Sequence, residues 1–251
     1  MKNLLYEAAL PFTELDGTAL ERFERFTEIM TEVNKSMNIT AITDPMGIAL
    51  KHHADSLSII STGLFSPEKR VCDIGCGGGF PGIPLKIAFP DMYINMIDST
   101  EKKINYLRNT ASLLGLSNMD FTAARAEELT KTGAKISHRE KYDIATARAV
   151  ARLNVLCELC LPFVKQGGYF VSMKGAKAEE EVSEAKNAAA MLGGKICEVK
   201  KIGFSLPSPY CDDPAVKEFC GADRYVIVIE KVKKTPPQYP RSYSAISKKP
   251  L

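Results

Sequence analysis

The fold is decided by the stretch Val71-Cys72-Asp73-Ile74-Gly75-Cys76-Gly77-Gly78-Gly79-Phe80-Pro81-Gly82. Its first four residues predict a short buried strand, and residues 83–89 predict a helix that Pro90 ends. A glycine-rich turn between a strand and a helix lets a ligand approach the backbone and presents free N–H groups to it. The stretch therefore predicts a ligand site at the end of a strand.

Strand and helix patterns alternate along the chain beyond this turn. Predicted strands cover 71–74, 93–98, 119–123, 142–147, 168–173, 196–202 and 225–230, and predicted helices cover 83–89, 100–114, 152–161 and 177–192. Such alternation indicates an α/β fold, in which helices cover both faces of a mostly parallel sheet. Because only a loop, 203–222, separates the last two strands, we expect that pair to be antiparallel.

The first 68 residues contain no comparable strand pattern. Thr18-Ala19-Leu20-Glu21 matches a capping box, and apolar residues follow it at three- and four-residue intervals as far as Met37. We therefore predict a helical N-terminal extension (1–68), an α/β domain (69–234) and a basic tail (235–251). Three prolines among residues 236–240 favour a tail that is extended and mobile without a partner.

The composition is that of a globular protein, with 45% hydrophobic and 25% charged residues. No stretch approaches the roughly 20 consecutive apolar residues of a membrane helix, and the N-terminus lacks the pattern of a secretory signal. The seven cysteines are scattered, and Cys157 and Cys160 indicate a buried helix face. We expect a monomeric cytoplasmic protein that contacts no membrane and binds no metal.

The formal net charge of +3 is unevenly distributed. Residues 231–251 contain six basic residues and no acidic one, so the rest of the chain carries a slight negative charge. A basic extension on a nearly neutral body is typical of an arm that touches polyanions, although a solubilising tail would have the same composition.

The glycine turn is compatible with two kinds of ligand, a dinucleotide and S-adenosylmethionine. Gly77, Gly79 and Gly82 match the dinucleotide pattern GxGxxG, with an acidic residue, Asp98, 21 residues beyond Gly77. Asp73, however, lies at the end of the strand, where its carboxylate would repel a pyrophosphate and attract the ammonium and sulfonium groups of S-adenosylmethionine. Two opposite charges about 4 Å apart attract by about 4 kcal/mol at an effective dielectric constant of 20. The sign of the charge thus favours S-adenosylmethionine over NAD.

Two further segments follow the next strands. Asp98 ends the second strand, where its carboxylate can bind both ribose hydroxyls; alternatively, it caps the following helix. Residues 124–127 follow the third strand and are placed to line the adenine edge of the same crevice.

Four parts of the sequence carry a family resemblance. They are Gly77-Gly78-Gly79-Phe80-Pro81-Gly82-Ile83-Pro84-Leu85 with Ile97-Asp98-Ser99; Asn38-Ile39-Thr40; Lys51-His52-His53-Ala54-Asp55-Ser56-Leu57; and Ala147-Arg148-Ala149-Val150-Ala151-Arg152-Leu153. In them the chain resembles the bacterial small-subunit ribosomal RNA guanine-N7 methyltransferases, also called glucose-inhibited division protein B. In the tail, Ser244 and Ile246 stand where related sequences have Gly and Pro.

The resemblance implies a Rossmann-like class I S-adenosylmethionine-dependent methyltransferase, with residues 69–234 as the methyltransferase domain and one antiparallel strand in its sheet. The implied reaction is methylation of N7 of a guanine in 16S ribosomal RNA, as free RNA or as a small ribosomal subunit precursor. A small-molecule methyltransferase and a non-catalytic RNA-binding ribosome assembly factor are the alternatives.

The expected cofactor contacts come from the family resemblance and from the glycine turn itself. The resemblance places them on Gly75, Phe80, Ala126, Glu127 and Arg148, with Asp98 as the acidic strand end, and the glycine turn adds Asp73, Gly77 and Gly79. Arg148 follows a strand end, where it contacts cofactor or RNA phosphate or forms a structural ion pair.

Lys51, His52 and Asp55, spaced three and four residues apart on a predicted helix, either contact the substrate or form a structural hydrogen-bond cluster. Guanine N7 already has a free lone pair, so we expect positioning and no catalytic base. Only His52 and His53 among the site candidates would ordinarily titrate near neutral pH.

Overall fold

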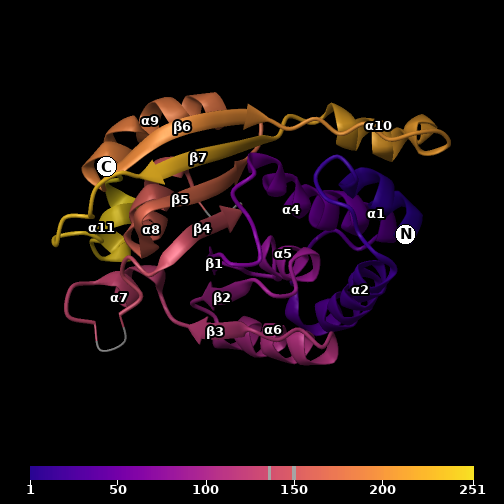
Figure 1. Cartoon of the computed structure of the whole chain (residues 1–251), viewed down its shortest axis with the longest axis horizontal. Helices are drawn as coiled ribbons and strands as arrows, with labels where there is room; N and C mark the ends of the chain where they lie inside the picture. Colours follow the sequence, from indigo (N-terminus) through magenta and orange to yellow (C-terminus); the bar gives the residue numbers. More distant parts are fainter. Residues whose placement is uncertain (135–136, 149–150) are drawn as a thin grey trace.

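A seven-stranded sheet forms the centre of the computed structural model, which describes residues 1–134, 137–148 and 151–251 (Figure 1). In chain order the strands are β1 (Arg70–Ile74), β2 (Tyr93–Asp98), β3 (Met119–Ala123), β4 (Tyr142–Arg148), β5 (Val164–Lys174), β6 (Gly194–Lys201) and β7 (Tyr225–Lys231). Their order in the sheet is β3-β2-β1-β4-β5-β7-β6. Only β7 runs antiparallel to its neighbours, so the predicted strands and the single antiparallel strand are confirmed.

Helices cover both faces of the sheet, as the alternating pattern predicted. On one face, α5 (Gly82–Ala88) and α6 (Glu101–Leu113) bury apolar side chains such as Ile83 and Leu107. On the other face lie α8 (Leu153–Cys160) and α9 (Ala178–Met191), where Cys157 and Cys160 are buried, so the predicted buried helix face is confirmed.

The N-terminal extension is helical and adds to the first of these apolar layers. It contains α1 (Lys2–Ala9), α2 (Gly17–Met37), α3 (Pro45–Gly47), the π-helical η1 (Ile48–Ala54), α4 (Asp55–Leu57) and the 3-10 helix η2 (Ser58–Thr62). Phe23 and Phe26 of α2 are buried in the same cluster as Ile83 of α5. The capping box at Thr18 is wrong, because Asp16 caps α2 and its Oδ1 accepts a hydrogen bond of 2.7 Å from Ala19 N.

The tail is ordered, which contradicts the expectation that residues 235–251 are extended and mobile. Tyr239 and Ile246 are buried against the layer formed by α8, and residues 243–248 form the short helix α11 (Tyr243–Lys248), seen beside α8 in Figure 1. The prolines disfavour regular helix or strand over residues 236–240, but they do not prevent the apolar side chains of the tail from packing. Other short helices are α7 (Ala126–Thr130), η3 (Leu161–Phe163), η4 (Tyr210–Asp212) and α10 (Pro214–Gly221).

The sheet topology fixes where a ligand can bind. The strand order reverses between β1 and β4, and in open α/β sheets ligands bind at such a point beyond the carboxyl ends of the strands. The glycine turn follows β1, and Arg148 is the last residue of β4. Among the helices described, none is long and apolar enough to cross a lipid bilayer.

Candidate functional site

The glycine turn depends on backbone conformations that favour glycine. Gly75, Gly77 and Gly79 have φ angles of 69°, 52° and 103°, in the left-handed region. A Cβ on Gly79 would lie 2.9 Å from side-chain atoms of Ile83 and Leu107, whereas a Cβ on Gly77 would approach nothing closer than Gly75 O at 3.8 Å. Gly79 therefore permits close helix packing, and Gly77 leaves room for a ligand.

A cleft of about 510 Å³ opens beside this turn, and we call it the glycine-turn cleft. Six of the predicted cofactor residues line it: Gly75, Gly77, Asp98, Ala126, Glu127 and Arg148. Three of the predicted residues, Asp73, Gly79 and Phe80, do not line it. The wall also contains Lys103, Leu156 and Tyr243, to which the sequence analysis assigned no role.

Asp98 is held in the wall of the glycine-turn cleft by two backbone donors. Its Oδ2 accepts a hydrogen bond of 3.1 Å from Gly77 N, and its Oδ1 accepts one of 2.8 Å from Thr100 N. The N-cap of α6 is Thr100, so Asp98 is not the N-cap residue. A carboxylate offers about four lone-pair positions, which leaves acceptors for two hydroxyl groups of a ligand.

Asp73 is fully buried beneath the turn. Its Oδ2 accepts a hydrogen bond of 2.9 Å from Gly82 N, while its Oδ1 has no hydrogen-bond partner among the described residues. Burial raises the pKa of the Asp73 carboxyl to about 7, against the opposing effects of the hydrogen bond from Gly82 N and the Arg148 guanidinium. An unsatisfied buried acceptor costs free energy, so a cationic ligand near the turn would be stabilised by it.

A second cleft, of about 590 Å³, also has Arg148 in its wall. We call it the arginine cleft, and its charged wall residues are Lys51, Asp55, Arg148, Arg152, Lys174, Glu181, Asp223 and Arg224. Lys174 is paired with Glu181 at 2.7 Å, and both side chains are largely buried. Arg148 is a wall residue of both clefts, so the two clefts meet at this residue.

Arg148 is fixed by three acceptors from the predicted helical cluster. Its Nη1 donates to Lys51 O and to Asp55 Oδ2, both at 3.1 Å, and its Nη2 donates to His52 Nδ1 at 3.1 Å. Asp55 Oδ1 in turn lies 3.1 Å from Arg224 Nε. The two interpretations of this cluster are therefore compatible, because a structural hydrogen-bond network also forms the wall of the arginine cleft.

His52 and His53 are neutral near pH 7, which contradicts the expectation that they titrate there. His52 Nδ1 accepts from Arg148, so His52 Nε2 carries the proton and donates to Thr40 Oγ1 at 2.7 Å. Burial, together with the Arg148 charge, lowers the pKa of His52 to about 4. Burial lowers the pKa of His53 to about 3, and its Nε2 lies 2.8 Å from Thr27 Oγ1.

Phe80 supports this network from below. The His52 ring is stacked on the Phe80 ring at 4.5 Å between centroids, and Arg148 Cζ lies 4.9 Å from the same centroid. Phe80 is buried, so its contacts in this structure are with protein groups. Ala149 and Val150, which belong to the motif Ala147–Leu153, lie outside the described residues.

Comparison with known proteins decides the family. A sequence model of the GidB family, described as rRNA small subunit methyltransferase G, matches residues 19–205. The chain belongs to the GidB family. Two GidB relatives named "Ribosomal RNA small subunit methyltransferase G" are similar over nearly their whole length. One, from Lysinibacillus sphaericus, is 44% identical over 95% of this chain and 93% of its own. The other, from Bacillus cereus, is 43% identical over 100% of this chain and 97% of its own.

Solved structures place the GidB chain in the class I S-adenosylmethionine-dependent methyltransferase fold. A SAM-dependent O-methyltransferase from Thermotoga maritima is 15% identical and covers 82% of this chain and 73% of its own, with a TM-score of 0.52. The [4+2]-cyclase SpnF is 16% identical and covers 85% and 95%, with a TM-score of 0.54. Because a cyclase shares the fold, the reaction has to be argued from the site and the family.

Proposed function

We propose that this protein transfers a methyl group from S-adenosylmethionine to N7 of a guanine in 16S ribosomal RNA. This proposal rests mainly on Arg148, which forms part of both clefts. A cofactor in the glycine-turn cleft would therefore lie next to an acceptor in the arginine cleft. Membership of the GidB family supports ribosomal RNA as the acceptor.

The residues of the glycine-turn cleft fit S-adenosylmethionine. The Asp98 carboxylate, already held by Gly77 N and Thr100 N, would bind the ribose hydroxyls. The Oδ1 of Asp73, which has no hydrogen-bond partner in the part of the chain that the structure describes, adds negative charge under the turn, near the place of the cationic methionine end. A pyrophosphate would meet the same charge as repulsion.

The arginine cleft fits a base presented by RNA. The side chains of Lys51 and Arg152 are 38% and 54% exposed, so their charged ends can contact phosphates from the wall of the cleft. Arg148 is held in place by Lys51 O, Asp55 and His52 and can therefore position the acceptor without moving.

Methyl transfer to guanine N7 requires the protein mainly to position the two reactants. When bound, S-adenosylmethionine supplies an electrophilic methyl group. Guanine N7 has an in-plane lone pair and no proton at neutral pH, so no residue has to remove one. The neutral His52 and His53 agree with a site that has no catalytic base.

The test is methyl transfer from labelled S-adenosylmethionine to 16S RNA, supplied both free and in the small ribosomal subunit. N7-methylguanine is mapped by reduction and strand cleavage, and the same map is made for cells with and without the gene. We expect one modified guanine that depends on the gene. If the protein methylates a small molecule but no RNA, it is a small-molecule methyltransferase instead. If it methylates neither, a non-catalytic assembly factor is supported.

A further inference from the structure

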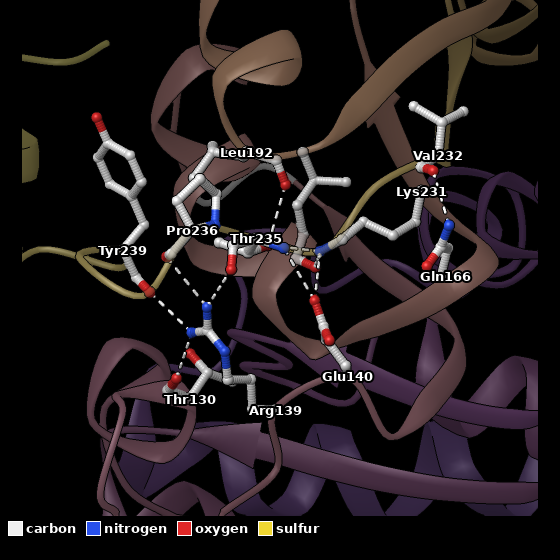
Figure 2. Close-up of polar contacts among 11 residues, drawn as sticks. Thr130, Arg139, Glu140, Gln166, Leu192, Lys231, Val232, Thr235, Pro236 and Tyr239 are labelled. Atoms are coloured by element: carbon white, nitrogen blue, oxygen red, sulfur yellow. Dashed lines mark hydrogen bonds and ion pairs between the residues drawn. The ribbon is translucent and has the colours of Figure 1, made fainter.

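The tail is attached to the body of the protein at two places, the first of which surrounds Arg139 and Thr235 (Figure 2). The Arg139 guanidinium donates to four backbone oxygens: Thr130 O at 2.8 Å, Tyr239 O at 2.7 Å, Thr235 O at 2.6 Å and Pro236 O at 3.1 Å. Three of these belong to the tail and one to α7. The end of α7 and the start of the tail are thus joined by one side chain.

Buried groups complete the first attachment. Thr235 N donates to Glu140 Oε1 at 2.9 Å, and Thr235 Oγ1 donates to Leu192 O at 3.0 Å (Figure 2). Lys231 Nζ donates to Thr235 Oγ1 at 2.5 Å and to Leu161 O at 2.6 Å. The path of the tail away from β7 is therefore fixed at its first residue.

The second attachment is the ion pair between Arg241 and Glu158 of α8. Arg241 Nη2 lies 2.6 Å from Glu158 Oε2, and Arg241 Nε and the backbone N both donate to Glu158 Oε1, at 2.9 and 2.8 Å. The Glu158 side chain is 0% exposed, so the tail supplies the charge that this carboxylate requires.

These two attachments place Tyr243 at the glycine-turn cleft. Tyr243 forms part of the cleft wall together with residues 124–127 and Leu156, and Arg125 Cζ lies 5.4 Å from the centroid of the Tyr243 ring. Tyr243 is 42% exposed, although Tyr239 and Ile246 on either side of it are buried. An aromatic ring with open surface thus lies beside the segment that follows β3, beyond Asp98.

We infer that Tyr243 is a cofactor-binding residue that covers the adenine ring of S-adenosylmethionine. The inference rests on the proposed function, in which Asp98 binds the ribose; the adenine then lies farther along the cleft, toward residues 124–127 and Tyr243. Stacking of a base on an aromatic side chain contributes about 1–3 kcal/mol. The tail is accordingly a strap that completes the cofactor site, and Arg241 anchors it.

The test measures binding by calorimetry to wild type, Tyr243→Ala, Tyr243→Phe and the control Lys249→Ala, an exposed tail residue. Two probes are used: S-adenosylhomocysteine, and 5′-methylthioadenosine, which keeps the adenosine and lacks the amino-acid part. Tyr243→Ala should weaken binding of both probes by the same factor, about 5- to 150-fold. Tyr243→Phe and Lys249→Ala should bind both probes like wild type.

Fluorescence gives an independent readout, because the chain has nine tyrosines and no tryptophan. S-adenosylhomocysteine should quench part of the tyrosine emission of wild type, and Tyr243→Phe should lose this quenching while it keeps its affinity. If wild type binds both probes and Tyr243→Ala binds them equally well, the inference about Tyr243 is wrong and the proposed function stands. If wild type binds neither probe, both are wrong.

Discussion

Asp55 Oδ2 accepts a hydrogen bond of 3.1 Å from Arg148 Nη1, and this contact holds the arginine between the two clefts. The other oxygen of Asp55 is paired with Arg224, so the carboxylate is itself held in position. The orientation of Arg148 is thus set by groups from the N-terminal extension, far from it in the chain.

Arg148→Lys should slow methyl transfer at least about tenfold, because an ammonium group cannot reach Lys51 O, Asp55 and His52 at once, and a small displacement of a positioning group is costly. Single-turnover rates with saturating RNA and cofactor measure this. Arg152→Lys is the matched control, since Arg152 lines the same cleft but its side chain is 54% exposed and pairs with Glu180 and Glu184 on the surface. Equal rates for the two variants would contradict a positioning role for Arg148.

Asp73 should make cofactor affinity dependent on pH. The carboxyl has a pKa of about 7 and must lose its proton to attract a cation, so the affinity of wild type for S-adenosylmethionine should rise with pH up to about 7 and then level off. Asp73→Asn should bind more weakly and show no such rise between pH 5.5 and 8.5. Calorimetry at four or five pH values is sufficient, and an identical rise in the variant would assign the ionisation to another group.

The same carboxyl should destabilise the unliganded protein at neutral pH. Because its pKa is raised from 3.8 to about 7 by folding, the native state binds the proton more tightly than the unfolded state. The free energy of unfolding therefore falls as pH rises between these two values. Asp73→Asn should be more stable than wild type at pH 8 and closer to it at pH 4, as thermal denaturation can show. Wild type being the more stable protein at pH 8 would contradict this sign.

The methyl-transfer step should be independent of pH from about 6 to 8.5 when RNA and cofactor are saturating. His52 and His53, with pKa values of about 4 and about 3, stay neutral throughout this range. His52→Gln can change affinity through its contacts with Arg148 and Thr40, but the shape of the profile should not change. A limb of the profile that disappears in this variant would show that the histidine takes part in the chemistry.

Arg241→Ala should lower the free energy of unfolding by about 3–5 kcal/mol, because it leaves the fully buried Glu158 carboxylate unpaired. Denaturant unfolding provides the measurement. Adding Glu158→Gln to this variant should recover part of the loss, since a neutral amide is less costly to bury. Lys248→Ala, at an exposed position of the same tail, should change stability by less than about 0.5 kcal/mol.

The contribution of the tail to RNA binding should be smaller than its composition suggests. Arg241 is occupied by Glu158, so only Lys248 and Lys249 beyond it remain exposed for phosphates. Replacing both lysines by alanine should reduce the slope of log K against log salt concentration by at most about 1.4 for single-stranded RNA. A further reduction of about 0.7 when Arg241→Gln is added to this double variant would mean that Arg241 leaves its partner when RNA binds.

Local sequence signals were enough to predict the sheet and the glycine-turn cleft. Strand patterns, glycines that need positive φ, and an acidic residue at the end of β2 are all properties of neighbouring residues, and the structure confirms the strands they predicted. What the sequence did not reveal depends on contacts between distant segments. Nothing near Asp55 indicates Arg224 as its second partner, and nothing near Glu158 indicates that this acidic residue is buried and paired with Arg241.

Tyr243 shows the same limit. Prolines and lysines in residues 235–251 are typical of a mobile basic arm, whereas the burial of Tyr239 and Ile246 in the structure reveals a packed segment. The apolar residues of the tail were a usable signal, since a purely solvating extension has no need of them.

Arg148 belongs to the walls of both clefts, so binding of cofactor and binding of RNA involve the same residue. A ligand that changes the hydrogen bonds of this guanidinium from one side alters the free energy of binding on the other. Such coupling is reciprocal by thermodynamic necessity: the factor by which cofactor changes RNA affinity equals the factor by which RNA changes cofactor affinity. Whichever ligand arrives first, the ternary complex is reached with the same cooperativity.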